Sequence, residues 1–412
     1  MDDPAEQTPE PEPAPLLELR DGLTEVVDSP DALARTCRLM AAGSGPLAID
    51  AERASGYRYG NRAYLIQIRR EGAGTALIDP TAFDSMAPLQ EATAGTEWIL
   101  HAATQDLPCL QEVGLRPTSL FDTELAGRLL GYPRVGLATL VEELLGFRMR
   151  KEHSAADWST RPLPAPWLDY AALDVEALVE LRHALSEQLV ADGKDEWARQ
   201  EFEYLLAFEP AVRADPWRRT SGSHRLRGRR ALAIVRELWE TRDRIARERD
   251  VAPGRIIPDS SIVVATQAMP TSVGELMGTQ GFHGRGARRH ARDWVAAIDR
   301  ARALPEDELP VRLPRSDGPP QARVWADKDP AAAARLAAAK PAMTELAESL
   351  NLPPENLLTP DTMRRVLWRP PTDRDDLAGA VAQELAQLGA RPWQIELTTG
   401  LLTDAVRAGE SA

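Results

Sequence analysis

The apolar run PLAIDAE, residues 46–52, carries two carboxylates, Asp50 and Glu52, within a stretch otherwise suited to a buried strand. On an extended strand, side chains at positions i and i+2 lie on the same face, so these two acids are neighbours of like charge. Their repulsion costs free energy unless they share a cation. The run therefore predicts a strand whose acidic face contributes to a cation site.

Two further segments supply acids with suitable spacing. In ILHAATQDL, Asp106 comes just after a predicted strand, where the chain turns into a helix. Residues 164–185 predict one long helix, since Pro166 suits a first turn and the apolar residues form one stripe. Tyr170 and Asp174 are one helical turn apart, on the side away from that stripe. We expect both side chains to face a cleft.

Three aspartates, a glutamate and a tyrosine are a set suited to two-metal hydrolysis of a phosphodiester. Mg²⁺ and Mn²⁺ prefer oxygen ligands, and two ions about 3.5–4 Å apart stabilise both the attacking and the departing oxygen. A phenol has a pKa of about 10, so ionising it near neutrality would cost on the order of 4 kcal/mol. We therefore expect Tyr170 to orient the attacking water while a metal lowers the pKa of that water.

Each of these residues also has a structural alternative. An aspartate that follows a strand, such as Asp106, often caps a helix, and Tyr170 could pack at a helix edge. Asp50 and Glu52 are harder to explain in this way, because a like-charged pair in an apolar run has few structural uses. The metal-site prediction depends on the joint occurrence of all the residues.

The pattern from about 20 to 205 predicts a mixed α/β sheet, because short apolar runs alternate with helical periodicity. Predicted strands are 46–52, 63–70, 75–80 and 97–103, and a helix over 30–43 precedes the first strand. Strand signals end near 221, and the rest of the chain reads as helices broken by Pro-rich segments.

The chain of 412 residues is long enough for two or three domains. The expected division is an acidic Pro-rich disordered tail, an α/β domain, a first helical domain, a Pro-rich linker and a second helical domain. Their expected ranges are 1–15, 16–210, 221–303, 304–322 and 323–412.

The two helical domains contain an internal similarity. ARERDVAPGRIIPDSSIVV, from Ala246, resembles AESLNLPPENLLTPDTMRRV, from Ala347. Pro253 corresponds to Pro354 and Ile256 to Leu357, each pair 101 residues apart. The similarity predicts a duplicated helical module, although shared helix–loop–helix chemistry is the alternative.

Charge is unevenly distributed along the chain. The formal net charge of −14 argues against a nucleic acid partner, but residues 213–230 hold seven arginines against Asp215, and residues 282–292 hold four. Such runs are often solvated faces; two in one region favour a surface that binds a polyanion. The candidate nucleic acid contacts here are Arg225, Arg227, Arg229, Arg230, Arg288 and Arg289.

Cysteine usage and hydropathy indicate the cellular compartment of the protein. Cys37 and Cys109 are far apart and lack metal-type spacing, which favours a reducing environment. No apolar run approaches the roughly 20 residues needed to span a bilayer, and the first residues are acidic where a signal peptide would be basic. We expect a cytoplasmic protein with no membrane partner; the pattern implies no oligomeric state.

Residues 40–205 resemble the DEDD-type 3′→5′ exonuclease domain of the ribonuclease D family, tyrosine subgroup, which has a ribonuclease H-like fold. The first family motif matches IDAE, the second LHAATQDL and the third YAALD. The resemblance implies that Asp50, Glu52, Asp106 and Asp174 bind two divalent ions, Mg²⁺ or Mn²⁺, and that Tyr170 positions the water. Ala51 departs from the family, which commonly has Thr there, but this side chain points to the opposite strand face.

Residues 221–303 resemble the HRDC domain, a helical nucleic-acid-binding module, and the last 90 residues look like a divergent second copy. Weaker candidates for nucleic acid contact lie in the α/β domain. Tyr57 and Tyr59 could stack on terminal bases, a contact worth about 1–3 kcal/mol per base, and His101 and Arg161 could touch phosphates. Packing or other structural roles are the alternatives for all four.

These observations predict a metal-dependent exoribonuclease that removes nucleotides from single-stranded RNA 3′ ends and releases nucleoside 5′-monophosphates. The resemblance implies structured RNA, such as tRNA precursors, as the substrate class. Nothing in the motifs recognises the 2′-hydroxyl, so a 3′→5′ DNA exonuclease is the alternative among enzymes. A non-catalytic nucleic-acid-binding scaffold is the alternative outside enzymes, although the presence of all five site residues weighs against it.

Overall fold

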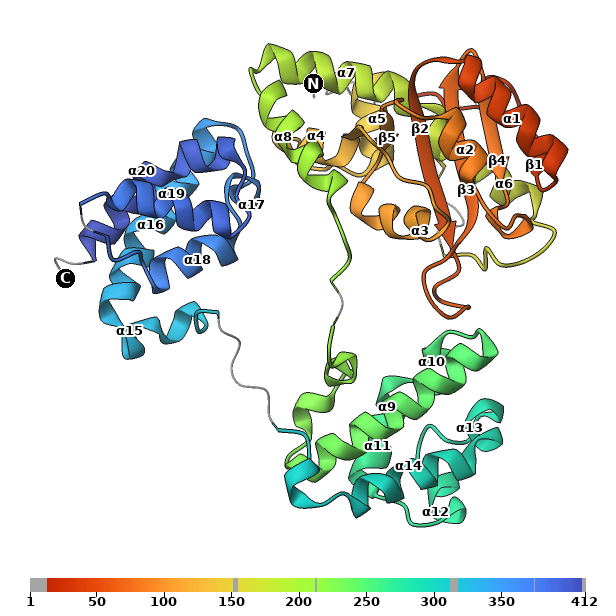
Figure 1. Ribbon diagram of the computed structural model, residues 1–412, viewed down its shortest axis with the longest axis vertical. Coiled ribbons are helices and arrows are strands. Elements are labelled where there is room, and N and C mark those ends of the chain that lie inside the picture. The colour runs from red at the N-terminus through yellow and green to blue at the C-terminus, as the bar shows by residue number, and fades with distance from the viewer. Residues whose placement is uncertain (1–12, 151–154, 212, 312–317, 374, 410–412) are drawn as a thin grey trace, which may run out of the picture.

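The computed structural model describes residues 13–150, 155–211, 213–311, 318–373 and 375–409. Figure 1 shows an α/β region followed by two helical regions. None of the helices within these ranges is both long and apolar enough to cross a bilayer.

The α/β region is built on one mixed sheet of six strands, in the order β1-β4-β3-β2-β5-β6. Strand β3 runs antiparallel to its neighbours β2 and β4, whereas β1 is parallel to β4, β5 to β2, and β6 to β5. The strands are β1 (Val26–Val27), β2 (Ser44–Arg53), β3 (Ala63–Glu71), β4 (Gly74–Ile78), β5 (Trp98–Leu100) and β6 (Leu120–Asp122). The prediction of a mixed α/β sheet is confirmed, with β1 and β6 as additional short strands.

Alternation along β2 and β3 gives the sheet two different faces. Ile49 and Ala51 pair with Ile68 and Ile66, and all four are buried in the main apolar core. The opposite face, which carries Asp50 and Glu52, is covered by α6 (Ala165–Glu176). The acids therefore lie between the sheet and a helix.

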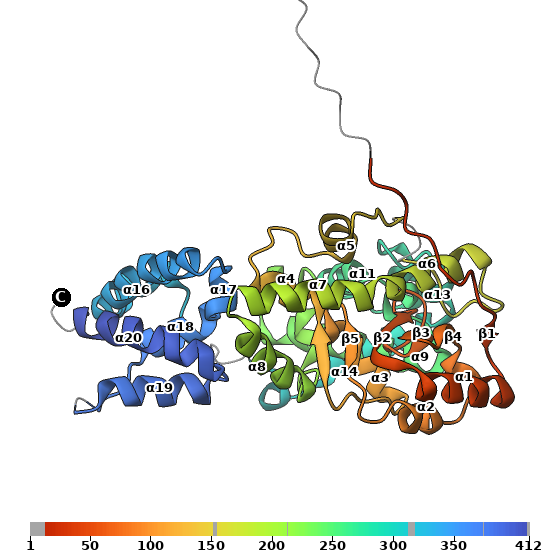
Figure 2. The ribbon, with the colours of Figure 1, turned by 90° about the horizontal axis from the view of Figure 1, so that it is seen from above.

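Seven other α-helices of the α/β region surround the sheet within the described residues (Figures 1 and 2). They are α1 (Pro30–Ala42), α2 (Ala87–Ala92), α3 (Leu107–Glu112), α4 (Thr123–Leu129), α5 (Leu137–Leu145), α7 (Leu178–Ala191) and α8 (Asp195–Leu206). The single helix predicted over 164–185 is two helices, α6 and α7, that meet at Ala177.

The first helical region has its own apolar core, which contains Trp217, Phe282 and Trp294. Its helices are α9 (Arg229–Arg249), α10 (Pro253–Ile256), α11 (Asp259–Ala268), α12 (Val273–Gly278), α13 (Arg285–Arg289) and α14 (Ala291–Ala303).

The second helical region shares one continuous core with the α/β region, and Figures 1 and 2 show it beside α8. At this contact the rings of Trp197 and Trp393 stack with centroids 4.8 Å apart. The helices are α15 (Trp325–Lys328), α16 (Pro330–Ser349), α17 (Pro354–Leu357), α18 (Pro360–Trp368), α19 (Leu377–Gln387) and α20 (Pro392–Ala408).

Part of the helical structure repeats. A long helix, a four-residue helix and a third helix follow one another in α9–α10–α11 and again in α16–α17–α18. Asp250 and Asn351, 101 residues apart, follow the long helices with left-handed backbone, at φ 47° and 49°. Both corners contact the α/β region: Asp250 accepts a hydrogen bond from the Tyr59 N–H, and the Asn351 amide donates to the Leu130 carbonyl.

The ends of the predicted tail and linker make specific contacts. The carbonyls of Ala14 and Pro15 accept hydrogen bonds from Arg148, so the chain is held by the α/β region before Leu16. Leu309 is buried and its carbonyl accepts a hydrogen bond from Arg229. Residues 1–12 of the predicted tail over 1–15 lie outside the described residues, as do residues 312–317 of the predicted linker over 304–322.

Candidate active site

Strand β2 determines the direction in which the first two acids, Asp50 and Glu52, point. In its antiparallel ladder with β3, Asp50 is opposite Gln67 and Glu52 is opposite Leu65. Residues directly opposite each other in such a ladder point to the same face, so all four side chains face α6. The like-charged pair predicted from the sequence thus lies on the face that the helix covers.

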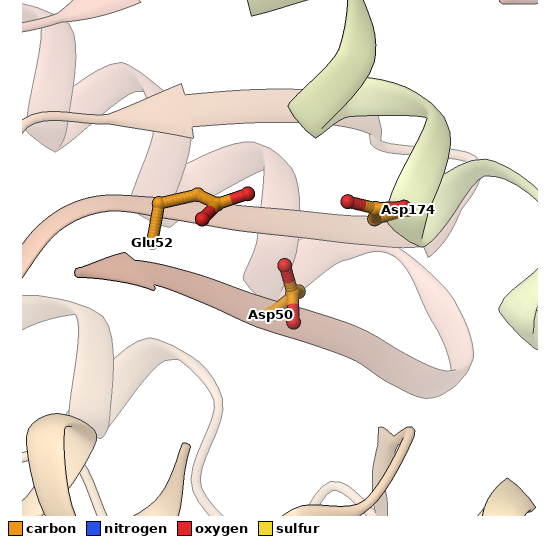
Figure 3. A group of neighbouring side chains, drawn as sticks. All are labelled: Asp50, Glu52 and Asp174. Atoms are coloured by element: carbon orange, nitrogen blue, oxygen red, sulfur yellow. The ribbon is translucent and has the colours of Figure 1, made fainter. Parts of the chain in front are cut away.

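Helix α6 brings the third carboxylate and the tyrosine to this face. The helix starts after Pro164, with Pro166 in its first turn, as the sequence predicted. Asp50, Glu52 and Asp174 each offer an oxygen within 4.8 Å of the others, and Figure 3 shows the three carboxylates pointing toward one another. The Tyr170 hydroxyl is hydrogen-bonded to Asp174. The structure therefore brings four of the five predicted residues into one cluster.

Asp106 joins this cluster through Asp50. It lies between a short 3₁₀ turn, Ala103–Gln105, and α3, and its side chain makes no capping hydrogen bond to the described part of that helix. Its carboxyl is instead hydrogen-bonded to that of Asp50, and Nη2 of Arg53 lies 3.6 Å from Oδ1. Helix capping therefore does not explain Asp106.

A second buried aspartate positions the turn that leads to Asp106. Ala102 has left-handed backbone at φ 59°, an uncommon conformation for a residue with a side chain. The Asp122 carboxylate accepts hydrogen bonds from the Ala102 and Ala103 N–H groups at 3.1 and 2.8 Å. It also accepts from the first N–H groups of α4. Asp122 thus holds the turn and caps the helix at the same time.

The acids of the cluster perturb one another strongly. Burial raises the pKa of Asp50, and burial with the charge of Asp50 raises the pKa of Asp174 well above its ordinary value. Burial and the charges of Asp50 and Asp174 raise the pKa of Glu52 to about 9. The pKa of Asp106 also rises well above its ordinary value through burial and Asp50. Burial and mutual repulsion therefore favour the protonated forms of these carboxyls, whereas a divalent ion would favour the ionised forms.

Four weaker candidates have structural partners. Nδ1 of His101 lies 2.9 Å from the Thr123 hydroxyl, and burial lowers the pKa of His101 to about 4, so the ring is neutral near pH 7. Arg161 binds both carboxylate oxygens of Asp79 and the Tyr64 carbonyl. A phosphate contact by either residue stays a prediction.

Tyr57 and Tyr59 contact the first helical region. The Arg255 guanidinium lies 4.1 Å from the centroid of the Tyr57 ring, and the Tyr59 hydroxyl donates a hydrogen bond to Asp243 at 3.1 Å. Figure 1 shows the β2–β3 loop, which carries both tyrosines, reaching toward α10. Base stacking by these rings stays a prediction, and their packing partner is another domain.

The arginine candidates divide into two groups. Arg229 donates to the Leu309 carbonyl, and Arg230 donates to carbonyls at the end of α14, including that of Ala301. The other four side chains are exposed: Arg225, Arg227, Arg288 and Arg289. Nucleic acid binding by these residues stays a prediction, and the exposed group is the better placed for it.

Three residues of this neighbourhood escaped the sequence analysis. Arg53 and Gln67 carry no local signal, because their significance depends on which acids the fold places beside them. Asp122 had a weak signal, since FDTEL reads as a helix N-cap, but its hold on the Ala102 turn joins distant parts of the chain.

Comparisons with known proteins agree with this geometry. Residues 24–190 match the family model for a 3′-5′ exonuclease, 231–298 the HRDC domain, and 318–406 a 3′ to 5′ exonuclease C-terminal domain. Ribonuclease D of Cronobacter turicensis is 35% identical over 295 residues, which cover 70% of this chain and 79% of the relative. Ribonuclease D of Escherichia coli K12 is 32% identical, over 69% and 77%.

Solved structures give the same result. A protein from Bifidobacterium adolescentis superposes with a TM-score of 0.88 at 38% identity, over 96% of this chain and 100% of that one. Escherichia coli RNase D, described as an exoribonuclease involved in structured RNA processing, gives 0.66 at 28% identity, over 89% and 99%.

A mixed-sheet domain with a cluster of four acids and a tyrosine, followed by helical modules of the HRDC type, defines a carboxylate-dependent 3′→5′ exonuclease. The chain belongs to the ribonuclease D family. It is a metal-dependent 3′→5′ exoribonuclease.

Proposed function

We propose that the acidic cluster binds two divalent ions, Mg²⁺ or Mn²⁺, and hydrolyses RNA from the 3′ end to nucleoside 5′-monophosphates. The observation that carries this proposal is the convergence of Asp50, Glu52 and Asp174 within 4.8 Å, with Asp106 hydrogen-bonded to Asp50. Four carboxylates form the all-oxygen donor set that hard divalent cations prefer. The residues present therefore fit the ions.

The geometry indicates which residues would hold the ions. Asp50 contacts both the close group and Asp106, so it joins the two parts of the cluster. Together Asp50, Glu52, Asp106 and Asp174 would hold the ions. The ions, when bound, supply the positive charge that lowers the pKa of the attacking water and stabilises the departing oxygen.

The protein's own groups orient the water. Burial and the charge of Asp174 raise the pKa of Tyr170 above its ordinary value, so the phenol stays protonated. Its hydroxyl donates to Asp174, and a phenol oxygen can accept a hydrogen bond while its O–H donates, here from the attacking water. Tyr170 is thus assigned to positioning rather than to proton abstraction.

The proposed substrates are single-stranded 3′ ends of structured RNAs, tRNA precursors among them. This class is supported by the description of the Escherichia coli relative and by the exposed arginines of the first helical region. Within the proposed division of the chain, the α/β domain performs the chemistry and the helical modules collect RNA. The repeated corners at Asp250 and Asn351 support a second, divergent HRDC-like module in the C-terminal region. The two free thiols, Cys37 and Cys109, support a cytoplasmic location.

A degradation assay on matched oligonucleotides tests this proposal. Labelled single-stranded RNA and DNA of one sequence are incubated with the protein and Mg²⁺ or Mn²⁺. The proposal expects stepwise shortening of RNA from the 3′ end, release of 5′-monophosphates and slower attack on DNA. Faster turnover of DNA would overturn the choice of RNA, and no turnover of either substrate would support the scaffold alternative.

A further inference from the structure

Gln67 is a buried amide in the middle of the sheet. The residue is fully shielded from solvent, yet neither its amide nitrogen nor its amide oxygen has a hydrogen-bond partner among the described residues. An unsatisfied buried donor costs free energy, and an apolar residue of the same size would avoid that cost. The chain nevertheless places an amide at this position.

The neighbours of Gln67 are fixed by the register of the sheet. Gln67 is opposite Asp50 on β2 and opposite Leu77 on β4. Along its own strand, the residues on the same face are Leu65 and Arg69. Leu65 and Leu77 belong to a small apolar cluster with α6. Among the directly opposed residues and the same-face residues of β3, Asp50 and Arg69 are thus the polar ones, and Glu52 and Thr75 lie diagonally beside the amide.

Arg69 is already committed elsewhere. Its Nη1 lies 3.2 Å from the Glu176 carboxylate and 3.1 Å from that of Asp21, and it donates to the Thr75 hydroxyl. Arg69 offers donors only, so it cannot accept from the Gln67 amide nitrogen. The polar residue directly opposite the amide is Asp50, whose carboxyl is part of the acidic cluster.

We propose that Gln67 is a positioning residue for the metal site, whose amide nitrogen donates a hydrogen bond to the Asp50 carboxylate in the metal-bound enzyme. This inference rests on the proposed function. Directly opposed residues have Cβ atoms about 4.5–5.5 Å apart, within reach of such a bond. Ligating carboxylates commonly need an outer partner of this kind, which fixes the orientation of the oxygens that bind the ion.

The test combines metal affinity with stability. Gln67→Met keeps the volume and removes the amide, and Gln67→Leu is a second apolar variant. Leu65→Met, on the same strand and face opposite Glu52, is the matched control. Mn²⁺ affinity is measured by titration calorimetry, and thermal unfolding is measured in EDTA.

We expect Gln67→Met to weaken Mn²⁺ binding tenfold or more, in the range of losses seen for outer partners of metal ligands. Its melting temperature in EDTA should equal or exceed that of the wild type, because an unsatisfied group has been removed. Unchanged Mn²⁺ affinity in both variants would overturn the inference; so would a loss matched by Leu65→Met. If the wild type itself binds no Mn²⁺, the metal site fails, and this inference fails with it.

Discussion

Asp174 and Glu176 lie two residues apart on α6, yet their surroundings differ completely. The Glu176 side chain is 1% exposed, and its carboxylate pairs with Arg20 at 3.0 Å and with Arg69 at 3.2 Å. Asp174 is half-buried, and its neighbours are the carboxyls of Asp50 and Glu52 and the Tyr170 hydroxyl.

The difference shows that the fully buried acid of this helix, Glu176, is paired with cations from other segments, whereas Asp174 is placed beside further acids. Two guanidinium groups compensate Glu176, whereas the carboxyls of the acidic cluster have one another as neighbours; the cluster is thus organised for a cation from solution. Arg53 is a partial exception, since it approaches Asp106, but at 3.6 Å and from one side. The predictions below test this contrast between compensated and uncompensated charge.

The largest expected effect is on turnover in Asp174→Asn. Losing one metal ligand should reduce RNA degradation about 1,000-fold, since metal ions contribute several kcal/mol and about 1.4 kcal/mol corresponds to tenfold. The same change should raise the stability of the protein in EDTA by about 1 kcal/mol, because an amide at this position is neutral at every pH and does not disfavour ionisation of Asp50 and Glu52. Turnover and chemical denaturation are the measurements. A destabilised but active variant would contradict the contrast.

The opposite response is expected for Glu176→Gln. Removing the charge leaves Arg20 and Arg69 without their buried partner, which should lower the free energy of unfolding by about 3 kcal/mol. Mn²⁺ affinity should stay within a few-fold of wild type, because Glu176 faces the arginines rather than the cluster. Urea denaturation and metal titration check the two parts, and a stability equal to wild type would show that the pair is not structural.

The arginines of the first helical region allow a matching comparison between exposed cations and cations that are bonded within the protein. Replacing the exposed Arg225 and Arg227 with Gln should weaken RNA binding and flatten its salt dependence, by about 0.7 in log–log slope for each lost phosphate contact. The control replaces Arg229 and Arg230, whose donors bind backbone carbonyls; this variant should lose stability instead. RNA-binding isotherms at several salt concentrations measure this salt dependence. If the Arg225/Arg227 variant and the wild type have equal slopes, those arginines belong to a solvated face.

A smaller effect is expected from pH. In the folded, metal-free protein Glu52 has a pKa of about 9, above its ordinary value of 4.5, so between these values the folded state binds more protons than the unfolded state. Its contribution to stability is therefore present below about pH 4.5 and is lost progressively as the pH rises toward 9. Since metal binding requires ionised carboxylates, the gain in melting temperature on adding Mn²⁺ should grow with pH. Glu52→Gln should flatten both trends, and an unchanged Mn²⁺ gain between about pH 6 and pH 8.5 would contradict this reasoning.

The sequence was informative where the signal is local. Apolar runs over 46–52 and 63–70 predicted β2 and β3, whereas β1 and β6, two and three residues long, do not belong to runs of that length. The break at Ala177 was missed because the apolar stripe continues from α6 into α7. The acids of the site, by contrast, were predicted as candidates, because the signal lay in their own spacing along the chain. Arg53, Asp122 and Gln67 were not, because their roles arise only when the fold places them beside those acids.

The way in which the helical modules contact the α/β region also could not be predicted from local sequence patterns. Spacing predicted the repeat, and Asp250 and Asn351 hold equivalent corners. Which surface each corner contacts depends on partners far away in the chain, Tyr59 for the first and Leu130 for the second. For the same reason Tyr57 and Tyr59 of the β2–β3 loop were candidates for base stacking with packing as the alternative, and the domain against which they pack was not foreseen.

The central claim is that five side chains from three segments form one cluster whose chemistry depends on divalent ions. The most direct test follows a labelled single-stranded RNA with a free 3′ end during incubation with EDTA-treated protein, before and after Mn²⁺ is added back. The account predicts no shortening in EDTA, restored stepwise shortening with Mn²⁺, and no restoration in Asp174→Asn. Full activity in EDTA, or equal restoration in that variant, would contradict it.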